Sequence, residues 1–60
     1  MNKAQRESFM GWLNSGIKIH EGFLEQHERE GQSQFGESRD YVLGYWDALK
    51  SVRKYITENA

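Results

Sequence analysis

The sequence predicts an all-α fold, an antiparallel helical hairpin completed as a four-helix bundle by homodimerisation. Apolar residues recur every three or four positions in two long segments, and a polar connector bounded by glycines separates them. The chain has only 60 residues and no cysteine. Such a short chain buries only about 60% of the surface exposed on unfolding, and without disulfides self-association is the expected source of additional stability.

The first helix is expected over residues 3–30 of a single domain, 1–60. Asn2 is placed to cap it, and Gln5 can complete a capping box. Asn14-Ser15-Gly16 alone would indicate a turn, but the apolar phase passes through it unchanged, which favours one continuous helix. The apolar positions are Met10, Leu13, Ile17, His20, Leu24 and His27, with Phe9, Trp12, Ile19 and Phe23 beside them. They cover about half of the helix circumference, enough to contact two neighbouring helices.

Three glycines interrupt this first helix. Gly11, Gly16 and Gly22 each cost about 1 kcal/mol relative to alanine, so the helix should be unstable when it is not packed. They are either tolerated weaknesses, or Gly11 and Gly22 on the polar face allow a partner backbone to come close.

The connector is expected over residues 31–37, with Phe35 folded back over the end of the core, and the second helix over 38–58, with Ser38 as its N-cap. Its heptad seam steps by four and three residues through Ser38, Val42, Tyr45, Leu49, Val52, Ile56 and Asn59, and is widened by Tyr41, Ala48 and Tyr55. The residues expected in the core or dimer interface are Phe9, Leu13, Ile17, His20, Leu24, Val42, Tyr45, Leu49, Val52 and Ile56.

Charge is segregated along the predicted hairpin. The loop end is acidic, with Glu21, Glu25, Glu28, Glu30, Glu37 and Asp40, whereas the end with the termini is basic, with Lys3, Arg6, Lys50, Arg53 and Lys54. A second hairpin packed antiparallel would bring unlike charges together. Exposed pairs contribute only ~0–1 kcal/mol each, so the pattern selects orientation more than it adds stability.

No catalytic, cofactor or metal site is predicted, and the chain is not expected to be an enzyme. His20 and His27 share a face but lie roughly 10.5 Å apart along the axis, too far to bind one metal ion together. They are expected to pack in the core, with a metal at a dimer axis as the alternative. Ser8 and Ser15 lie away from both histidines, so no serine and histidine converge for nucleophilic catalysis.

The overall charge and hydropathy predict a cytoplasmic protein. The net charge is −1 and the pI about 6.1, so no overall field attracts nucleic acid or an acidic membrane surface. No secretory signal is visible, and no segment approaches the roughly 20 apolar residues of a membrane span.

One stripe on the second helix stands out as a candidate site for a protein partner. It consists of Arg39, Leu43, Trp46, Lys50 and Arg53. Leu43 lies where the amphipathic pattern calls for a polar residue, and tryptophan and arginine are enriched at binding hot spots. Alternatively, Trp46 extends the dimer core and the cations cover its rim. A third interpretation is nucleic-acid binding, in which the cations bind phosphate and the ring stacks on a base.

The segment Tyr41-Val42-Leu43-Gly44-Tyr45-Trp46-Asp47-Ala48-Leu49, followed by Val52, resembles the G-[YF]-x-D-A-L-x-x-[VI] helices of small bacteriophage and prophage orphan proteins. The resemblance implies a small phage-encoded inhibitor that binds a bacterial enzyme or anti-phage defence complex in the host cytoplasm. Together with the composition, it favours a non-enzymatic protein-interaction module. The alternative is a dimeric nucleic-acid-binding regulator of the helical-hairpin type.

Overall fold

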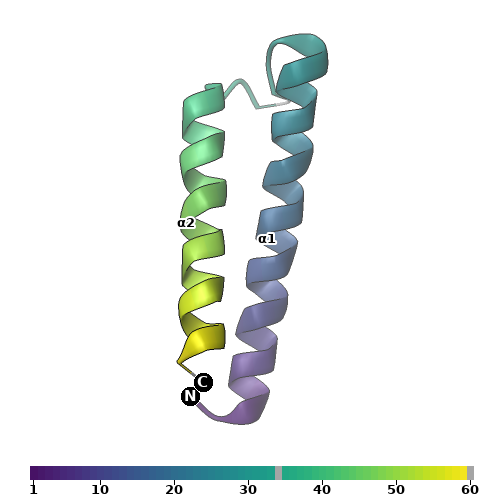
Figure 1. The fold of residues 1–60 in the computed structure, drawn as a ribbon. Coiled ribbons are helices and arrows are strands. Elements are labelled where there is room, and N and C mark those ends of the chain that lie inside the picture. The colour runs from purple at the N-terminus through teal and green to yellow at the C-terminus, as the bar shows by residue number, and fades with distance from the viewer. Residues whose placement is uncertain (34, 60) are drawn as a thin grey trace.

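The computed structural model describes residues 1–33 and 35–59, which form two antiparallel α-helices and no strand (Figure 1). Helix α1 spans Lys3–Glu30 and helix α2 spans Arg39–Glu58. The predicted all-α hairpin is therefore confirmed. Residue 34 of the expected connector lies outside the described residues.

Local capping interactions set the helix ends. The Asn2 side chain accepts a hydrogen bond from the Gln5 N–H at 2.8 Å, and the Gln5 side chain accepts one from the Asn2 N–H at 3.0 Å, as the predicted capping box requires. Helix α1 ends at Gly31, whose φ of +77° is left-handed and whose N–H donates to the His27 carbonyl. At the start of α2, the Ser38 hydroxyl accepts from the Tyr41 N–H at 3.1 Å.

Helix α1 runs without interruption through residues 14–16. Gly16 lies against α2, where an added Cβ would come within 3.1 Å of Leu49 Cδ1. A glycine at this position therefore lets the two helices approach closely. Gly11 and Gly22 have open space where a Cβ would stand, so they form no close contact within the hairpin.

The core between the helices is small. Leu13, Ile17 and Leu49 form a buried cluster, and Val42 is also buried. Partly buried side chains pack against the cluster from both helices: Phe9, Met10, Trp46 and Ile56.

The predicted heptad seam is wider than the contact between the helices. Val42 and Leu49 are buried, whereas Tyr45 and Val52 remain 43% and 41% exposed. Each helix has only one neighbour within the hairpin, so one edge of its apolar arc stays uncovered.

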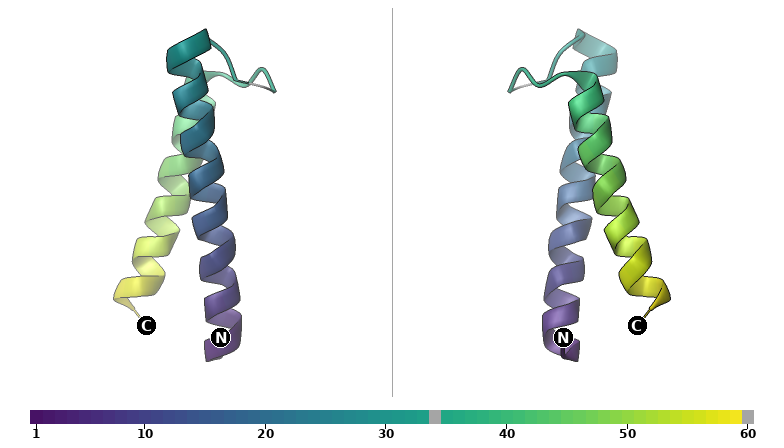
Figure 2. Two further views of the ribbon diagram at one scale, coloured as in Figure 1. Left: turned by 90° about the vertical axis from the view of Figure 1, so that its right-hand side faces the viewer. Right: turned by 90° about the vertical axis from the view of Figure 1, so that its left-hand side faces the viewer.

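The molecule is a rod of 41 × 16 × 14 Å. Its two helices diverge toward the termini, and the connector projects to one side at the opposite end (Figure 2). Within the connector Phe35 packs edge-on against Phe23, with ring centroids 5.7 Å apart, yet stays 68% exposed. In the described part of the chain, neither helix is long and apolar enough to cross a membrane.

Candidate protein-interaction surfaces

The hairpin exposes a set of large apolar side chains on one side, called here the aromatic face. Its members are Trp12, Ile19, Tyr41, Tyr45, Val52 and Tyr55. Residues 12 and 19 are seven apart on α1, and the α2 members follow steps of four, seven and three, so each set lies on one side of its helix. A shallow hollow of about 240 Å³ joins the two sets, lined by Trp12, Ser15, Gly16, Ile19, His20, Tyr45 and Leu49.

Ring contacts organise the loop half of this face. The His20 imidazole stacks on Tyr45 with centroids 4.5 Å apart and planes 4° from parallel. Tyr41 continues the series beyond Tyr45 at 6.3 Å, and Phe23 meets His20 edge-on at 5.5 Å. With Phe35 on Phe23, these rings form a continuous series from α2 across α1 to the connector, which places the projecting connector at one end of the aromatic face.

The two histidines have different environments. The His20 Nδ1 lies 2.7 Å from the Gly16 carbonyl oxygen, which can only accept, so Nδ1 is the donor and orients the ring against α2. The His27 Nε2 atom is shielded from solvent and has no hydrogen-bond partner among the described residues. His20 thus supports the aromatic face, while His27 carries an unsatisfied polar atom.

The predicted partner-binding stripe lies on the other flank of the helix contact. Trp46 packs against the core, and its Nε1 donates to the Glu21 carboxylate at 3.2 Å. Lys50 Nζ sits 4.0 Å from the centroid of the Trp46 ring. Arg53 donates to the Asn14 side-chain oxygen at 3.0 Å. These three stripe residues therefore make contacts inside the hairpin.

The two remaining stripe residues differ in exposure: Leu43 is half-buried and Arg39 is exposed. The five stripe residues thus lie on one flank of the hairpin, but Trp46 and Arg53 contact α1 and Lys50 covers the Trp46 ring. The aromatic face is a separate surface that the sequence interpretation did not distinguish from the core. The positions of Tyr41 and Tyr55 beside the heptad seam were the sequence feature that could have indicated this exposed face.

Electrostatics at the loop end centre on Glu37. The Ser33 hydroxyl donates to its carboxylate, which lowers the pKa of Glu37 below its ordinary value. A backbone hydrogen bond of Glu37 lowers its pKa further, desolvation acts in the opposite direction, and the electrostatic interaction with His20 and His27 makes a smaller lowering contribution. The carboxylate is therefore ionised at neutral pH.

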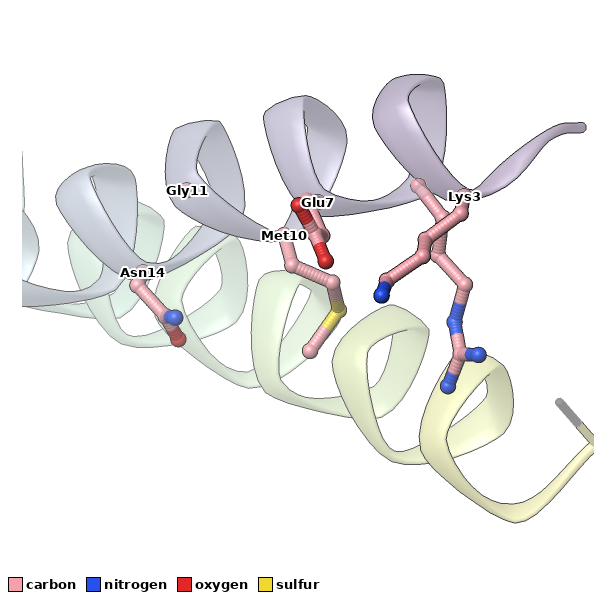
Figure 3. A pocket seen from close by; sticks show the side chains of 6 residues that line it. Lys3, Glu7, Met10, Gly11 and Asn14 are labelled. Atoms are coloured by element: carbon pink, nitrogen blue, oxygen red, sulfur yellow. The ribbon is translucent and has the colours of Figure 1, made fainter.

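A hollow of about 560 Å³ lies along the first half of α1 (Figure 3). It is lined by Lys3, Arg6, Glu7, Met10, Gly11 and Asn14. No serine or histidine lies among these residues, so no hydroxyl nucleophile is paired with a base there. Among the described residues, no group of three or more metal-ligating side chains is close enough together to bind a metal ion.

Comparison with protein families, with curated proteins and with solved structures finds no match to this chain.

Proposed function

We propose that this chain is a non-enzymatic protein-interaction module that works as a homodimer and binds a larger protein. One observation carries the proposal: the six side chains of the aromatic face are 41–68% exposed on one side of the hairpin. With large side chains offering up to about 150–250 Å² each, this face amounts to roughly 600 Å², the upper end of what a monomeric protein exposes. A surface of this kind is typical of protein–protein contact.

Homodimerisation would complete the fold. Each helix has a wide apolar arc and a single neighbour, and only four apolar side chains are buried in the described hairpin: Leu13, Ile17, Val42 and Leu49. A four-helix bundle would cover the second edge of each arc. Sedimentation equilibrium at micromolar concentration tests this part: a folded species of twice the 7.1 kDa chain mass is expected, and a folded monomer would contradict it.

The surface proposed for the larger partner is the side of the hairpin that carries the stripe Arg39, Leu43, Trp46, Lys50 and Arg53, called here the Trp46 flank. Arg39 is exposed and Leu43 is half-buried on this flank, and together they offer a cation beside an apolar side chain. The target class suggested by the resemblance of residues 41–49 is a bacterial enzyme or defence complex. Capture of such a target from a bacterial lysate should fall more than tenfold with the double substitution Arg39→Glu and Leu43→Glu.

A matched control is available for that experiment. Arg29→Glu reverses the charge of another exposed arginine, on the side of α1 turned away from α2, and should leave capture unchanged. Circular dichroism and sedimentation of the double variant establish that it still folds and dimerises. If the folded double variant captures the target normally, the Trp46 flank is not the binding surface.

Nucleic acid is the competing ligand of the same flank, and the same experiment separates the two classes. Lys50 covers one face of the Trp46 ring, and Glu21 holds its Nε1, which leaves less of the ring free to stack on a base. Binding through the three stripe cations of each copy, six phosphate contacts in a dimer, would fall about 10³-fold between 50 and 200 mM salt, and nuclease treatment would remove it. Capture that survives both treatments supports a protein partner.

A further inference from the structure

Resting on the proposed homodimer, the geometry points to a specific arrangement of its two copies. We infer that they meet through their aromatic faces in antiparallel orientation, with Phe35 of each copy seated in the hollow between the helix ends of the other. The Trp46 flank then stays on the outside of the dimer. Four features support this: the centre of the face, its two ends, its charges and its size.

The centre of the aromatic face is suited to close contact between identical surfaces. The α2 residues 41, 45, 48, 52 and 55 share one side, and the middle member is Ala48, the smallest side chain among them. Across from it on α1 lie Ser15 and Gly16, which line the hollow of about 240 Å³ together with Tyr45. A two-fold axis through these small residues lets two helix pairs approach closely, as a self-complementary dimer contact requires.

The two ends of the hairpin differ in shape. At the loop end the connector projects to one side (Figure 2), and Phe35 stands 68% exposed on Phe23. At the terminus end, where the helices diverge, a hollow of about 360 Å³ is lined by Met1, Arg6, Tyr55, Ile56 and Asn59. In an antiparallel pair, the projecting connector of each copy lies against the terminus-end hollow of the other. Parallel copies would oppose two projections and leave both hollows empty.

Positions along the chain agree with this pairing. The connector precedes Arg39, the first residue of α2, and the hollow adjoins Tyr55 and Ile56 near its other end. The midpoint between these levels falls close to Ala48. A two-fold axis at Ala48, where the side chains are small, therefore also brings Phe35 of one copy to the hollow at the terminus end of the other.

Charge favours the same orientation. Glu37 follows Phe35 in the connector, and Arg6 lines the hollow that would receive the ring. Docking of Phe35 would therefore bring a carboxylate of one copy near a guanidinium of the other, at both ends of the dimer. The six members of the aromatic face carry no charge, so no charged member must be desolvated at the centre.

The size of the face is sufficient for a stable pair. About 600 Å² from the six side chains of each copy gives roughly 1,200 Å² in total, before Phe35 and its hollow are added. This reaches the lower bound of about 1,200 Å² for specific, stable interfaces.

The natural chain has no cysteine, so a single introduced cysteine reports on one position. In Ala48→Cys the two sulfurs lie near the axis, and mild oxidation should give a disulfide-linked dimer in high yield. Lys18→Cys, exposed on the outer side of α1, is the matched control and should stay uncross-linked. Spin labels on Thr57→Cys, nine residues beyond Ala48, should lie about 27 Å apart along the axis when the copies are antiparallel. Parallel copies would remove this axial separation, so the labels would lie closer together than in antiparallel copies.

Two further variants test the docking of the connector. Phe35→Ala and Tyr55→Ser alter the projection and the hollow separately, and each should raise the dimer dissociation constant more than tenfold with helicity retained. Tyr55 is 68% exposed, so its substitution leaves the hairpin core intact. Gln32→Ala, another exposed connector position, serves as the control and should dimerise normally.

The outcomes separate this inference from the proposed homodimer. A dimer in which Ala48→Cys fails to cross-link, or in which the labels at position 57 lie close together, overturns the face or the orientation alone. A dimer unaffected by Phe35→Ala overturns the docking of the connector, whatever the effect of Tyr55→Ser, because Tyr55 also belongs to the aromatic face. A folded monomer overturns the homodimer as well and would leave the aromatic face to a foreign protein.

Discussion

The contact between Gly16 and Leu49 allows a quantitative test of how the two helices meet. Leu49 is 8% exposed and packs in the cluster with Leu13 and Ile17. Truncating such a leucine to alanine typically costs 2–5 kcal/mol. A domain of this size has a total stability of only about 3–9 kcal/mol, so Leu49→Ala should remove much of the free energy of unfolding.

Gly16→Ala should behave differently in the two backgrounds. Alanine is worth about 1 kcal/mol more than glycine in a helix, but with Leu49 present its Cβ would lie 3.1 Å from Leu49 Cδ1, so the leucine must shift. We expect the two effects roughly to cancel. In the Leu49→Ala background the obstruction is gone, and the new methyl group adds up to about 0.8 kcal/mol by burial. The predicted coupling between the two positions is therefore about 1–2 kcal/mol.

Urea denaturation of the four proteins, followed by far-ultraviolet circular dichroism, measures this coupling. All samples must have one protein concentration, because the midpoint of an associating protein depends on it. Gly11→Ala is the control: a Cβ there meets open space, so its gain of about 1 kcal/mol should be the same in both backgrounds. If Gly16→Ala also stabilises both backgrounds equally, Leu49 does not pack against Gly16 and the helix rotation described above is wrong.

Three further substitutions have local expected effects. Asn2→Ala removes the helix cap and should lower stability by about 1 kcal/mol in thermal melts, whereas Asn2→Ser should not; equal melting temperatures for both would contradict the capping role. His27→Leu removes an unsatisfied buried nitrogen and should raise stability by about 1 kcal/mol, and a lower melting temperature would show that the imidazole is satisfied in solution. Because the pKa of Glu37 is lowered on folding, its ionisation stabilises the hairpin above about pH 4.5, and this contribution is lost as the pH falls through the lowered value. Ser33→Ala should raise that pKa in a nuclear magnetic resonance titration and weaken the pH dependence of stability, and an unchanged titration would argue against the hydroxyl contact.

The predictable part of this fold depends on local interactions. Asn2 and Ser38 cap the helices through hydrogen bonds to residues three positions away, which the spacing of polar side chains already indicates. Gly31 ends α1 because a left-handed residue is needed there. The continuity of α1 through residues 14–16 followed from the unbroken apolar period, which outweighed the turn-forming composition of that segment.

The part that the sequence left open concerns the rotation of each helix about its axis. Both apolar arcs are about half a circumference wide, so the pattern alone cannot say which edge meets the other helix. Gly16 against Leu49 and His20 against Tyr45 determine that rotation, and both contacts join residues far apart in the sequence. For the same reason the stripe pattern alone could not decide whether Trp46 packs against the core, as it does in the structure.

Both chain ends lie at the same end of the rod, where Met1 and Asn59 line one hollow, while the connector lies at the other end (Figure 1). A circular permutant of residues 1–60 is therefore feasible: a short peptide would join one end of this segment to the other, and new ends would be opened within residues 31–37. In such a chain α2 would be synthesised before α1, yet the contacts between the two helices would be retained. Because the connector would no longer link the two helices covalently, the permutant would separate the contribution of helix order to folding from the contribution of helix packing.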